Sequence, residues 1–345
     1  MKILLLTHKF FPDIGGIESN SEILAQAYMA SGFDVHVLTW SVGQTNKKFN
    51  FPIIRNPGIW QLIKEHNWAD LIFENNPSLR LSWPLLFFNK PSIIVLHTWI
   101  TRTNGNINWQ DKIKNFWLGR ATKVVACSHV IKNMTWPAAI VISNPYQESV
   151  FKYLPAINRT NDFVFLGRLV SDKGVNIAIK AFSKLLIALK RNTHFNTLHF
   201  TIIGNGPERE ILEKEVMEFG LQNKISFTGS LRGEKLTTLL NRHKFIIVPS
   251  TWQEPFGMVA LEGMACGCIP IVSDGGGLPE AVGNAGIIFK SGDADELTLA
   301  MLNIIENEAM QQQLRNAATV HLKYHRSEEV SKRFIQLVNE VLIKT

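Results

Sequence analysis

Short, nearly continuous apolar runs alternate with longer stretches in which apolar residues recur every three or four positions. Runs of the first kind are typical of strands buried on both faces of a parallel sheet, and stretches of the second kind indicate helices. In the first half the pattern predicts strands at residues 2–8, 34–40, 71–75, 92–98, 123–128 and 139–144, and helices at 16–31, 78–88 and 108–121. This alternation predicts a doubly wound α/β sheet.

A polar stretch from residue 145 to residue 162 interrupts this pattern and is typical of a linker. Strands are then predicted at 163–167, 198–204, 225–229, 245–250, 269–274 and 286–290, and helices at 175–190, 208–219, 235–242, 257–265, 295–306 and 327–343. Two α/β sheets joined by a linker are expected to bind ligands in a cleft at the carboxyl ends of their strands.

Composition narrows the class of protein. The 345 residues suffice for two domains at roughly 150 residues each, and 46% apolar with 19% charged residues excludes a disordered chain. A net charge of +7 favours anionic partners. Cys266 and Cys268 lie in an apolar stretch, so we expect buried core residues rather than a redox or metal pair. We find neither a secretory signal nor a membrane span and expect a cytoplasmic protein.

Glycine-rich turns follow several predicted strands, where they would let the backbone approach an anion. Gly15-Gly16 opens a helix whose free amides favour an anion, although an ordinary tight turn is the alternative. Gly204-Asn205-Gly206-Pro207 lacks the third glycine of a dinucleotide fingerprint, and we interpret it as a close backbone approach to a nucleotide. Asp274-Gly275-Gly276-Gly277 follows a later strand and is expected to line the same cleft.

Two cations flank the turn after the strand at 163–167. Arg168 follows Gly167, and Lys173 precedes Gly174 at the start of the next predicted helix. Arginine grips phosphate oxygens as a planar fork and lysine acts as a point charge, so the two suit a diphosphate. A pair of solvated surface charges is the alternative, against which the position at a strand's carboxyl end argues.

The segment 250–265 carries two carboxylates eight positions apart. Pro255 forces Glu254 into an extended loop conformation, where it can reach a hydroxyl-rich group. Glu262 falls on the second turn of the next helix and can accept both hydroxyls of a ribose. Because that helix is otherwise almost wholly apolar, an ionised Glu262 requires a partner. The backbone amides of residues 257–259, at the helix start, favour a phosphate.

Two further positions admit opposite interpretations. His97 ends a predicted strand, so it is either a residue that projects into the cleft or a buried structural histidine. Asp293-Ala294-Asp295 looks like a metal-binding Asp-x-Asp motif, but it lies where a helix begins, and we interpret Asp293 as a helix cap. Since no other carboxylates gather in the sequence, we expect no divalent metal.

Together these motifs resemble the retaining glycosyltransferases of family 4. The resemblance covers nearly the whole chain and rests on Gly15-Gly16, His97, Gly167-Arg168-Leu169, Lys173-Gly174, Gly204-Asn205-Gly206-Pro207, Glu254 to Glu262 and Gly276-Gly277-Leu278-Pro279-Glu280. It implies the GT-B fold, in which two Rossmann-like domains face a cleft. An acceptor-side domain would cover residues 1–155, a nucleotide-sugar-binding domain 156–325, and a C-terminal helix over 326–345 would cross back to the first domain.

The resemblance also implies an activity and the residues that perform it. The donor would be a UDP- or GDP-linked sugar, the acceptor a glycan or lipid-linked molecule of cell-surface polysaccharide or glycolipid synthesis, and no cofactor is expected. Arg168 and Lys173 would hold the diphosphate, Glu254 and His97 the donor sugar, and Glu262 the ribose. The other implied donor contacts are Gly15, Gly16, Gly206, Leu231, Phe256, Gly257, Met258 and Val259, with the backbone of Leu231 next to the base. Retention would follow from attack on the leaving-group face, with a donor phosphate oxygen taking the acceptor's proton.

A basic, aromatic segment in the first half suggests a second partner. Residues 102–132 hold six cations (Arg102, Lys112, Lys114, Arg120, Lys123 and Lys132) and one acid, Asp111, together with Trp109, Phe116 and Trp117. This composition suits peripheral docking on the anionic inner face of the cell membrane. The alternative is that the aromatic residues belong to the core and the charges are merely solvated.

Other function classes fit less well. A GT-B sugar-nucleotide epimerase or hydrolase would need additional acids and histidines in the cleft. A non-catalytic GT-B partner subunit would be expected to have lost Arg168, Lys173 or Glu262, all of which are present. Nucleic-acid binding is disfavoured, because the net charge is modest and we find no known reading motif.

Overall fold

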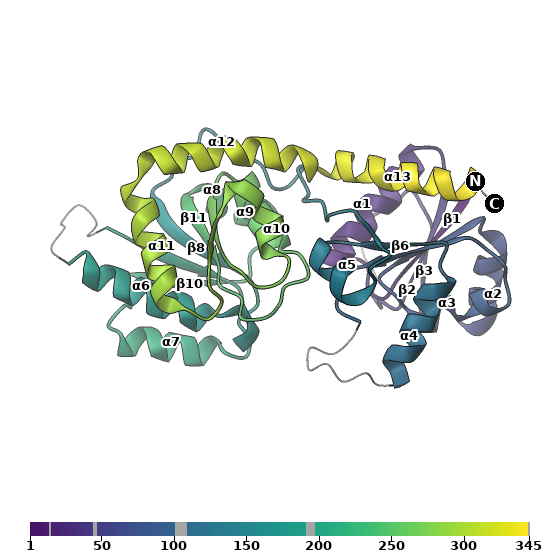
Figure 1. Cartoon of the computed structure of the whole chain (residues 1–345), viewed down its shortest axis with the longest axis horizontal. Helices are drawn as coiled ribbons and strands as arrows, with labels where there is room; N and C mark the ends of the chain where they lie inside the picture. The colour runs from purple at the N-terminus through teal and green to yellow at the C-terminus, as the bar shows by residue number, and fades with distance from the viewer. Residues whose placement is uncertain (14, 44–46, 101–108, 191–196, 344–345) are drawn as a thin grey trace. The chain divides into compact units, whose positions relative to one another are not determined.

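The computed structural model describes residues 1–13, 15–43, 47–100, 109–190 and 197–343. They form two compact units, one comprising Met1–Pro145 with Arg326–Thr345 and the other Tyr146–His325 (Figure 1). Each unit is built around one parallel sheet flanked by helices. The predicted doubly wound α/β architecture is confirmed.

The sheet of the first unit has the strand order β3-β2-β1-β4-β5-β6-β7. Its strands are β1 (Lys2–Thr7), β2 (Asp34–Thr39), β3 (Ile53–Arg55), β4 (Leu71–Asn75), β5 (Ser92–Leu96), β6 (Lys123–Ala126) and β7 (Ile140–Val141). Its helices are α1 (Gly16–Ala30), α2 (Ile59–Trp68), α3 (Leu79–Ser82), η1 (Trp83–Leu86), α4 (Trp109–Arg120), α5 (His129–Thr135) and α13 (Ser327–Ile343). The central strands β4 and β5 are buried along their whole length, which explains their unbroken apolar runs.

The sheet of the second unit has the order β10-β9-β8-β11-β12-β13. Its strands are β8 (Asn161–Leu166), β9 (Phe200–Ile203), β10 (Ile225–Gly229), β11 (His243–Val248), β12 (Ile269–Ser273) and β13 (Ile287–Phe289). Its helices are η2 (Ser171–Lys173), α6 (Val175–Ala188), α7 (Arg209–Glu218), α8 (Gly233–Asn241), α9 (Met258–Ala265), α10 (Leu278–Val282), η4 (Gly283–Ala285), α11 (Ala294–Glu306) and α12 (Glu308–Tyr324). All its strand pairs are parallel, so their carboxyl ends meet at one edge.

The predicted strands are all present, and the differences lie in short or polar elements. The sequence pattern did not predict β3, α2, α5, α10 and α12, nor the short helices η2 and η4. Helix α12 buries only Leu314 fully, so its apolar stripe is too narrow to stand out. The single helix predicted over 78–88 is wrong: Pro84 lies in the first turn of η1, and the segment divides into α3 and η1.

The second unit begins ten residues before the expected boundary at residue 156. Helix α8 explains the difference, because its side chains hold the preceding segment. Asn241 accepts from Leu154 N at 2.8 Å and donates to Lys152 O at 2.9 Å, and Thr237 donates to Val150 O at 3.0 Å. These bonds satisfy backbone groups that a free linker would leave to water.

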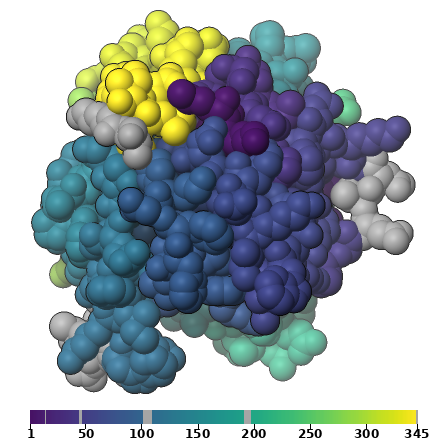
Figure 2. Space-filling model, turned by 90° about the vertical axis from the view of Figure 1, so that its right-hand side faces the viewer, coloured from purple at the N-terminus to yellow at the C-terminus, as the bar shows by residue number. Residues whose placement is uncertain are grey.

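The last helix, α13, completes the core of the first unit. Its buried face carries Val330, Phe334, Leu337, Val338 and Val341. The Phe334 ring lies 5.8 Å from the Phe73 ring on β4, in an edge-on arrangement. Figure 2 shows the end of α13 (yellow) beside the N-terminal residues (purple) on one face of this unit.

Two properties bear on the class of protein. Cys266 and Cys268 are free and buried, which confirms their interpretation as core residues. In the part of the chain that the structure describes, no helix is both long and apolar enough to cross a membrane.

Truncating the Phe334 side chain tests the contribution of α13 to the first unit. Phe334 is 1% exposed, so Phe334→Ala should leave a cavity and cost about 3–5 kcal/mol. Ile343→Ala on the same helix, where the side chain is 82% exposed, should change stability by no more than about 0.5 kcal/mol. Urea unfolding compares the two, and equal midpoints would contradict the packing described here.

Candidate functional site

The candidate residues of the second unit lie in loops that follow the carboxyl ends of β8, β9, β11 and β12. Backbone bonds tie the first two loops together: Gly167 N donates to Ile203 O and Leu169 N to Asn205 O, both at 3.0 Å. Gly206 is required by this contact, because a Cβ at its position would lie 2.1 Å from Leu169 O. The glycine interpreted as room for a nucleotide therefore makes room for the neighbouring loop.

An ion pair joins the loops after β8 and β11. Lys173, at the end of η2, donates from Nζ to Glu254 Oε1, and both side chains are half-buried. Ser250 Oγ donates to the same oxygen at 2.7 Å. The other oxygen, Oε2, accepts no hydrogen bond from the residues that the structure describes. The pair therefore fixes the carboxylate and leaves its Oε2 atom able to accept a hydrogen bond from a ligand.

Arg168 is the second residue after the end of β8 and is exposed. Its guanidinium forms no ion pair with a carboxylate in the described part of the chain. Arg168 and the Lys173–Glu254 pair thus lie at the same sheet edge, and no described carboxylate neutralises the charge of Arg168. A cation at such an edge can form charge-assisted hydrogen bonds with phosphate oxygens.

The segment after Glu254 is held against the glycine-rich turn that follows β12. Glu254 and Gly276 form a parallel bridge, and Gly277 N donates to Glu254 O at 2.7 Å. Helix α9 starts next, with Gly257 at its N-cap and, among the described residues, no side chain capping its first turn. The amides of Met258 and Val259 lie in that turn, where the helix dipole favours an anion.

Phe256 and Leu231, two further expected donor contacts, lie in different surroundings. The Phe256 side chain is buried, with its ring 5.6 Å from the His325 ring, so it contributes packing and only its backbone can face a ligand. Leu231 lies in the loop between β10 and α8 and lines a shallow groove with Glu234, Lys235 and Arg242.

Glu262 lies on the second turn of α9 among apolar residues. Burial raises the pKa of its carboxyl group to about 8. No described residue forms a hydrogen bond with its side chain. An ionised Glu262 is expected to require a partner, and the described residues supply none.

The candidates of the first unit gather around the start of α1. His97 follows β5 and is buried; its Nε2 lies 2.7 Å from Asn75 Oδ1 and 3.3 Å from Asn20 Nδ2. Burial lowers the His97 pKa to about 4, against a smaller opposing effect of a hydrogen bond with Asn144. The imidazole is therefore neutral at physiological pH, suited to hydrogen bonding rather than to proton transfer. Gly15 and Gly16 lie one turn before Asn20, with Glu18 in the first turn.

The two asparagines that hold His97 were not among the residues predicted from the sequence. Asn75 ends β4, the strand next to β5, and also donates to Ser21 Oγ at 2.7 Å. A polar residue at the carboxyl end of a buried strand was the available signal, the same one that identified His97. Asn20 had no such signal, because it lies within an amphipathic helix.

The basic segment divides into buried and exposed aromatic residues. Trp117 is buried and donates from Nε1 to the Glu74 carboxylate at 2.8 Å, and burial raises the Glu74 pKa to about 7. Trp109 and Phe116 are 64% and 61% exposed on the same helix, α4. The core alternative is thus right for Trp117 and wrong for the other two. Arg102 and residue 108, which belonged to the expected segment and helix, lie outside the described residues.

The Asp-x-Asp motif is a helix cap, as predicted. Asp293 accepts from the backbone N–H groups of Asp295 at 2.9 Å and Glu296 at 3.0 Å, at the start of α11. The described residues contain no group of three or more His, Cys, Asp or Glu side chains placed to hold a metal ion.

Comparison with known proteins bears on the family and on the fold. The family model for glycosyl transferases group 1 matches residues 147–321, just over half of the chain. A glycogen synthase of Mycobacterium tuberculosis is 27% identical over 281 residues, which cover 76% of this chain but only 64% of that protein. A glycosyltransferase of Methanocaldococcus jannaschii is 28% identical over 346 residues, covering 91% of each chain.

Two solved structures share the fold. HepE of Anabaena, in complex with UDP and glucose, superposes with a TM-score of 0.81 at 19% identity, covering 99% of this chain and 100% of that one. Sucrose-phosphate synthase of Thermosynechococcus elongatus gives 0.80 at 19% identity and covers both chains completely. The fold is GT-B, and the chain belongs to the glycosyl transferases group 1 family.

Proposed function

We propose that this protein is a retaining glycosyltransferase that moves a sugar from a nucleotide diphosphate to a glycan or lipid-linked acceptor. The observation that carries the proposal is the unneutralised Arg168 at the same sheet edge as the Lys173–Glu254 pair. A diphosphate would accept from the Arg168 guanidinium, from the remaining N–H donors of Lys173 and from the first amides of α9. UDP-linked donors are the first to test, because HepE, which shares the fold, was crystallised with UDP and glucose.

Each remaining candidate in the second unit has a chemical task in this proposal. Glu254 Oε2 would accept from a hydroxyl of the donor sugar while Lys173 and Ser250 hold its other oxygen. Glu262 would accept from the ribose hydroxyls and so gain the partners it lacks in the protein alone. Leu231 would contact the base through its backbone. In the first unit, His97 Nε2 already contacts Asn75 and Asn20, so a bond to a sugar hydroxyl would require one of these amides to move away.

The reaction follows from where charge develops. As the bond between the anomeric carbon and the phosphate oxygen breaks, its electron pair stays on the diphosphate and positive charge builds on the sugar ring. Arg168, Lys173 and the α9 amides would stabilise the leaving group without a metal ion. The acceptor hydroxyl would attack from the leaving-group face and pass its proton to a phosphate oxygen, which retains the anomeric configuration.

Substitution of Arg168 tests the diphosphate site with little risk to the fold. Because Arg168 is exposed and has no ion pair, Arg168→Ala should leave the melting temperature unchanged. Loss of charge-assisted bonds worth about 1.5–3 kcal/mol should weaken UDP binding about 10- to 150-fold in isothermal titration. Lys214→Ala, an exposed cation on α7, is the matched control and should bind as the wild type does. Equal affinity in all three proteins would contradict the assignment.

The buried Glu262 carboxyl group is expected to lower the stability of the protein at high pH and to strengthen nucleotide binding. Its folded pKa is about 8, whereas a glutamate in an unfolded chain titrates near 4.3, so folding takes up a proton between these values. The contribution of this protonation to the free energy of unfolding is complete below about pH 4 and is lost as the pH rises to about 8. Glu262→Gln removes this loss, so its melting temperature should exceed the wild-type value by more at about pH 8.5 than at about pH 5.

The same variant should bind UDP more weakly, because an amide is a poorer acceptor for two hydroxyls than a carboxylate. Its preference for UDP over 2′-deoxy-UDP should fall as well. Glu306→Gln, at the exposed end of α11, should show neither effect. A Glu262→Gln protein that gains no stability at high pH, or that still discriminates against the deoxynucleotide, would refute this role.

We further propose that α4 docks on an anionic membrane. Figure 2 shows α4 (blue) at the lower edge of the first unit, and its exposed Trp109 and Phe116 accompany Lys112 and Arg120. Leu86 and Phe87 are exposed at the neighbouring η1, which Arg120 contacts through Leu85 O at 3.4 Å. Trp117, anchored on Glu74, would fix the helix to its sheet while the other aromatic residues enter the interface.

Vesicle flotation tests the membrane proposal. The protein should float with vesicles containing phosphatidylglycerol and not with pure phosphatidylcholine. Burial of each aromatic side chain in the membrane interface would contribute about 1.5–3 kcal/mol to binding. The double variant Trp109→Ser/Phe116→Ser loses both contributions, so it should float at least about 10-fold more weakly. Trp60→Ser on α2, where the side chain is 83% exposed, is the control. Absence of flotation with acidic vesicles, or equal weakening by the control, would exclude this surface.

A further inference from the structure

A cavity of about 520 Å³ lies at the opposite edge of the second sheet from the candidate donor site. Ile269, the first residue of β12, lines it, as does Arg159, which lies two residues before β8. The glycine-rich turn of the donor site follows the other end of β12. Five residues of strand, at about 3.3 Å each, separate the two edges by roughly 16 Å. The cavity is therefore a separate place in the same unit.

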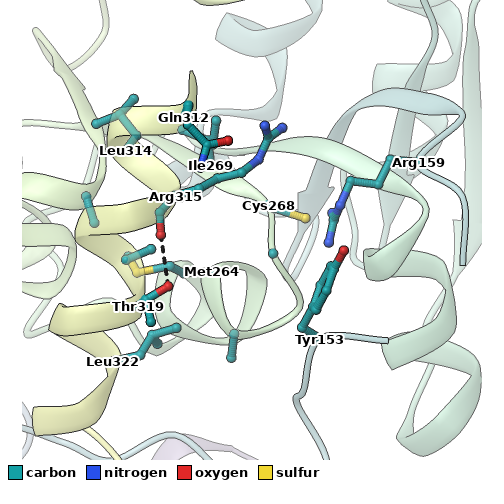
Figure 3. Close-up of a pocket in the computed structure, with 14 residues that line it drawn as sticks. Tyr153, Arg159, Met264, Cys268, Ile269, Gln312, Leu314, Arg315, Thr319 and Leu322 are labelled. Atoms are coloured by element: carbon teal, nitrogen blue, oxygen red, sulfur yellow. Dashed lines mark hydrogen bonds between the residues drawn. The ribbon is translucent and has the colours of Figure 1, made fainter. Parts of the chain in front are cut away.

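The first charged group of the cavity is built into the fold. Arg159 donates to His243 O and, at 2.6 Å, to Cys266 O, and its guanidinium lies 5.3 Å from the centre of the Tyr153 ring. Gly267 makes room for it, because a Cβ there would lie 2.1 Å from Arg159 Nη2. Figure 3 shows the Arg159 guanidinium and the Tyr153 hydroxyl directed into the same space.

The second charged group comes from α12. The Arg315 side chain extends from this helix toward the wall that carries Arg159 (Figure 3), and its Nη2 donates a long hydrogen bond, 3.4 Å, to Gln311 Oε1. Neither arginine forms an ion pair with a carboxylate of the residues that the structure describes. Burial and the charge of Arg159 both lower the Arg315 pKa. Two like charges thus share a cavity that provides no counter-charge.

The other residues that line the cavity indicate which kind of ligand it can hold. Met264, Ile269 and Leu314 form an apolar floor, and Gln312, Thr319 and Tyr153 add groups that hydrogen-bond neutral partners. The volume is within the range of small-molecule sites, about 300–1,000 Å³. A phosphate monoester carries about −1.5 to −2 charges at neutral pH, so it balances the two guanidinium groups. A ligand with a single carboxylate would balance only one of them.

We propose that this cavity binds a small phosphate monoester with an uncharged, hydroxyl-bearing body, such as a sugar phosphate. Arg315 and Arg159 hold the phosphate, and Gln312 and Thr319 contact the body. The site is distinct from the donor site, so its occupancy does not depend on Arg168 or Lys173.

Thermal shift and isothermal titration of the full chain test the site, with hexose 6-phosphate, glucose and inorganic phosphate as probes. Hexose 6-phosphate should raise the melting temperature, inorganic phosphate should do so less, and glucose should not. Arg315→Gln should weaken hexose 6-phosphate binding at least about 10-fold. Lys323→Gln, an exposed cation on α12, and Arg168→Ala should bind it as the wild type does.

A second variant guards against a folding effect of the charge change. Ala318→Phe fills the cavity from α12 and should also abolish binding while every charge remains. Unchanged binding in Arg315→Gln or Ala318→Phe would overturn the proposal. Loss of binding in Arg168→Ala would place the phosphate at the donor site instead. Binding to vesicles with phosphatidic acid, but to no soluble phosphate at about 10 mM, would overturn the small-molecule assignment.

Discussion

A parallel sheet covered by helices on both faces has little room for polar side chains except at the ends of its strands. Both units obey this constraint: β4 and β5 are buried throughout, and the polar residues Asn75 and His97 lie at or just after their carboxyl ends. In the second unit the same rule places Arg168 after β8 and Ser250 after β11. The chemistry of the protein is thus concentrated in loops whose positions the sheet dictates.

Within that frame, the candidate donor site is partly assembled and partly incomplete. The Lys173–Glu254 pair, the bond from Ser250 and the bridge between Glu254 and Gly276 fix the loops before any ligand arrives. Arg168 and Glu262, by contrast, have no partners of opposite charge or hydrogen-bonding partners among the described residues. Glu262 is buried, so its lack of a partner reduces stability, and a ligand that supplies one recovers that free energy as affinity. Arg168 is exposed and hydrated, so it offers its charge to a ligand without a cost to stability. An anionic ribonucleotide would satisfy both.

The sequence predicted the architecture and the loops of the site because both follow from local patterns. Buried strands appear as apolar runs, and the glycines and charges after them mark the carboxyl edges. Pairings between distant residues were not predictable: Lys173 and Glu254 lie 81 positions apart, and Asn75 and His97 are 22 apart. Gly206 shows a subtler limit, since close approach of a ligand and close approach of Leu169 O require the same residue. Helix α12 was missed because its buried stripe is narrow, and with it the cavity formed by Arg159 and Arg315.

A crystal structure with bound UDP is the sharpest test of the proposal that the second unit holds a nucleotide's diphosphate at the carboxyl edge of its sheet. We expect both phosphates within hydrogen-bond distance of Arg168, Lys173 and the first amides of α9, with the ribose hydroxyls on Glu262. Density for the diphosphate at any other place in the chain, or a ribose turned away from Glu262, would contradict it.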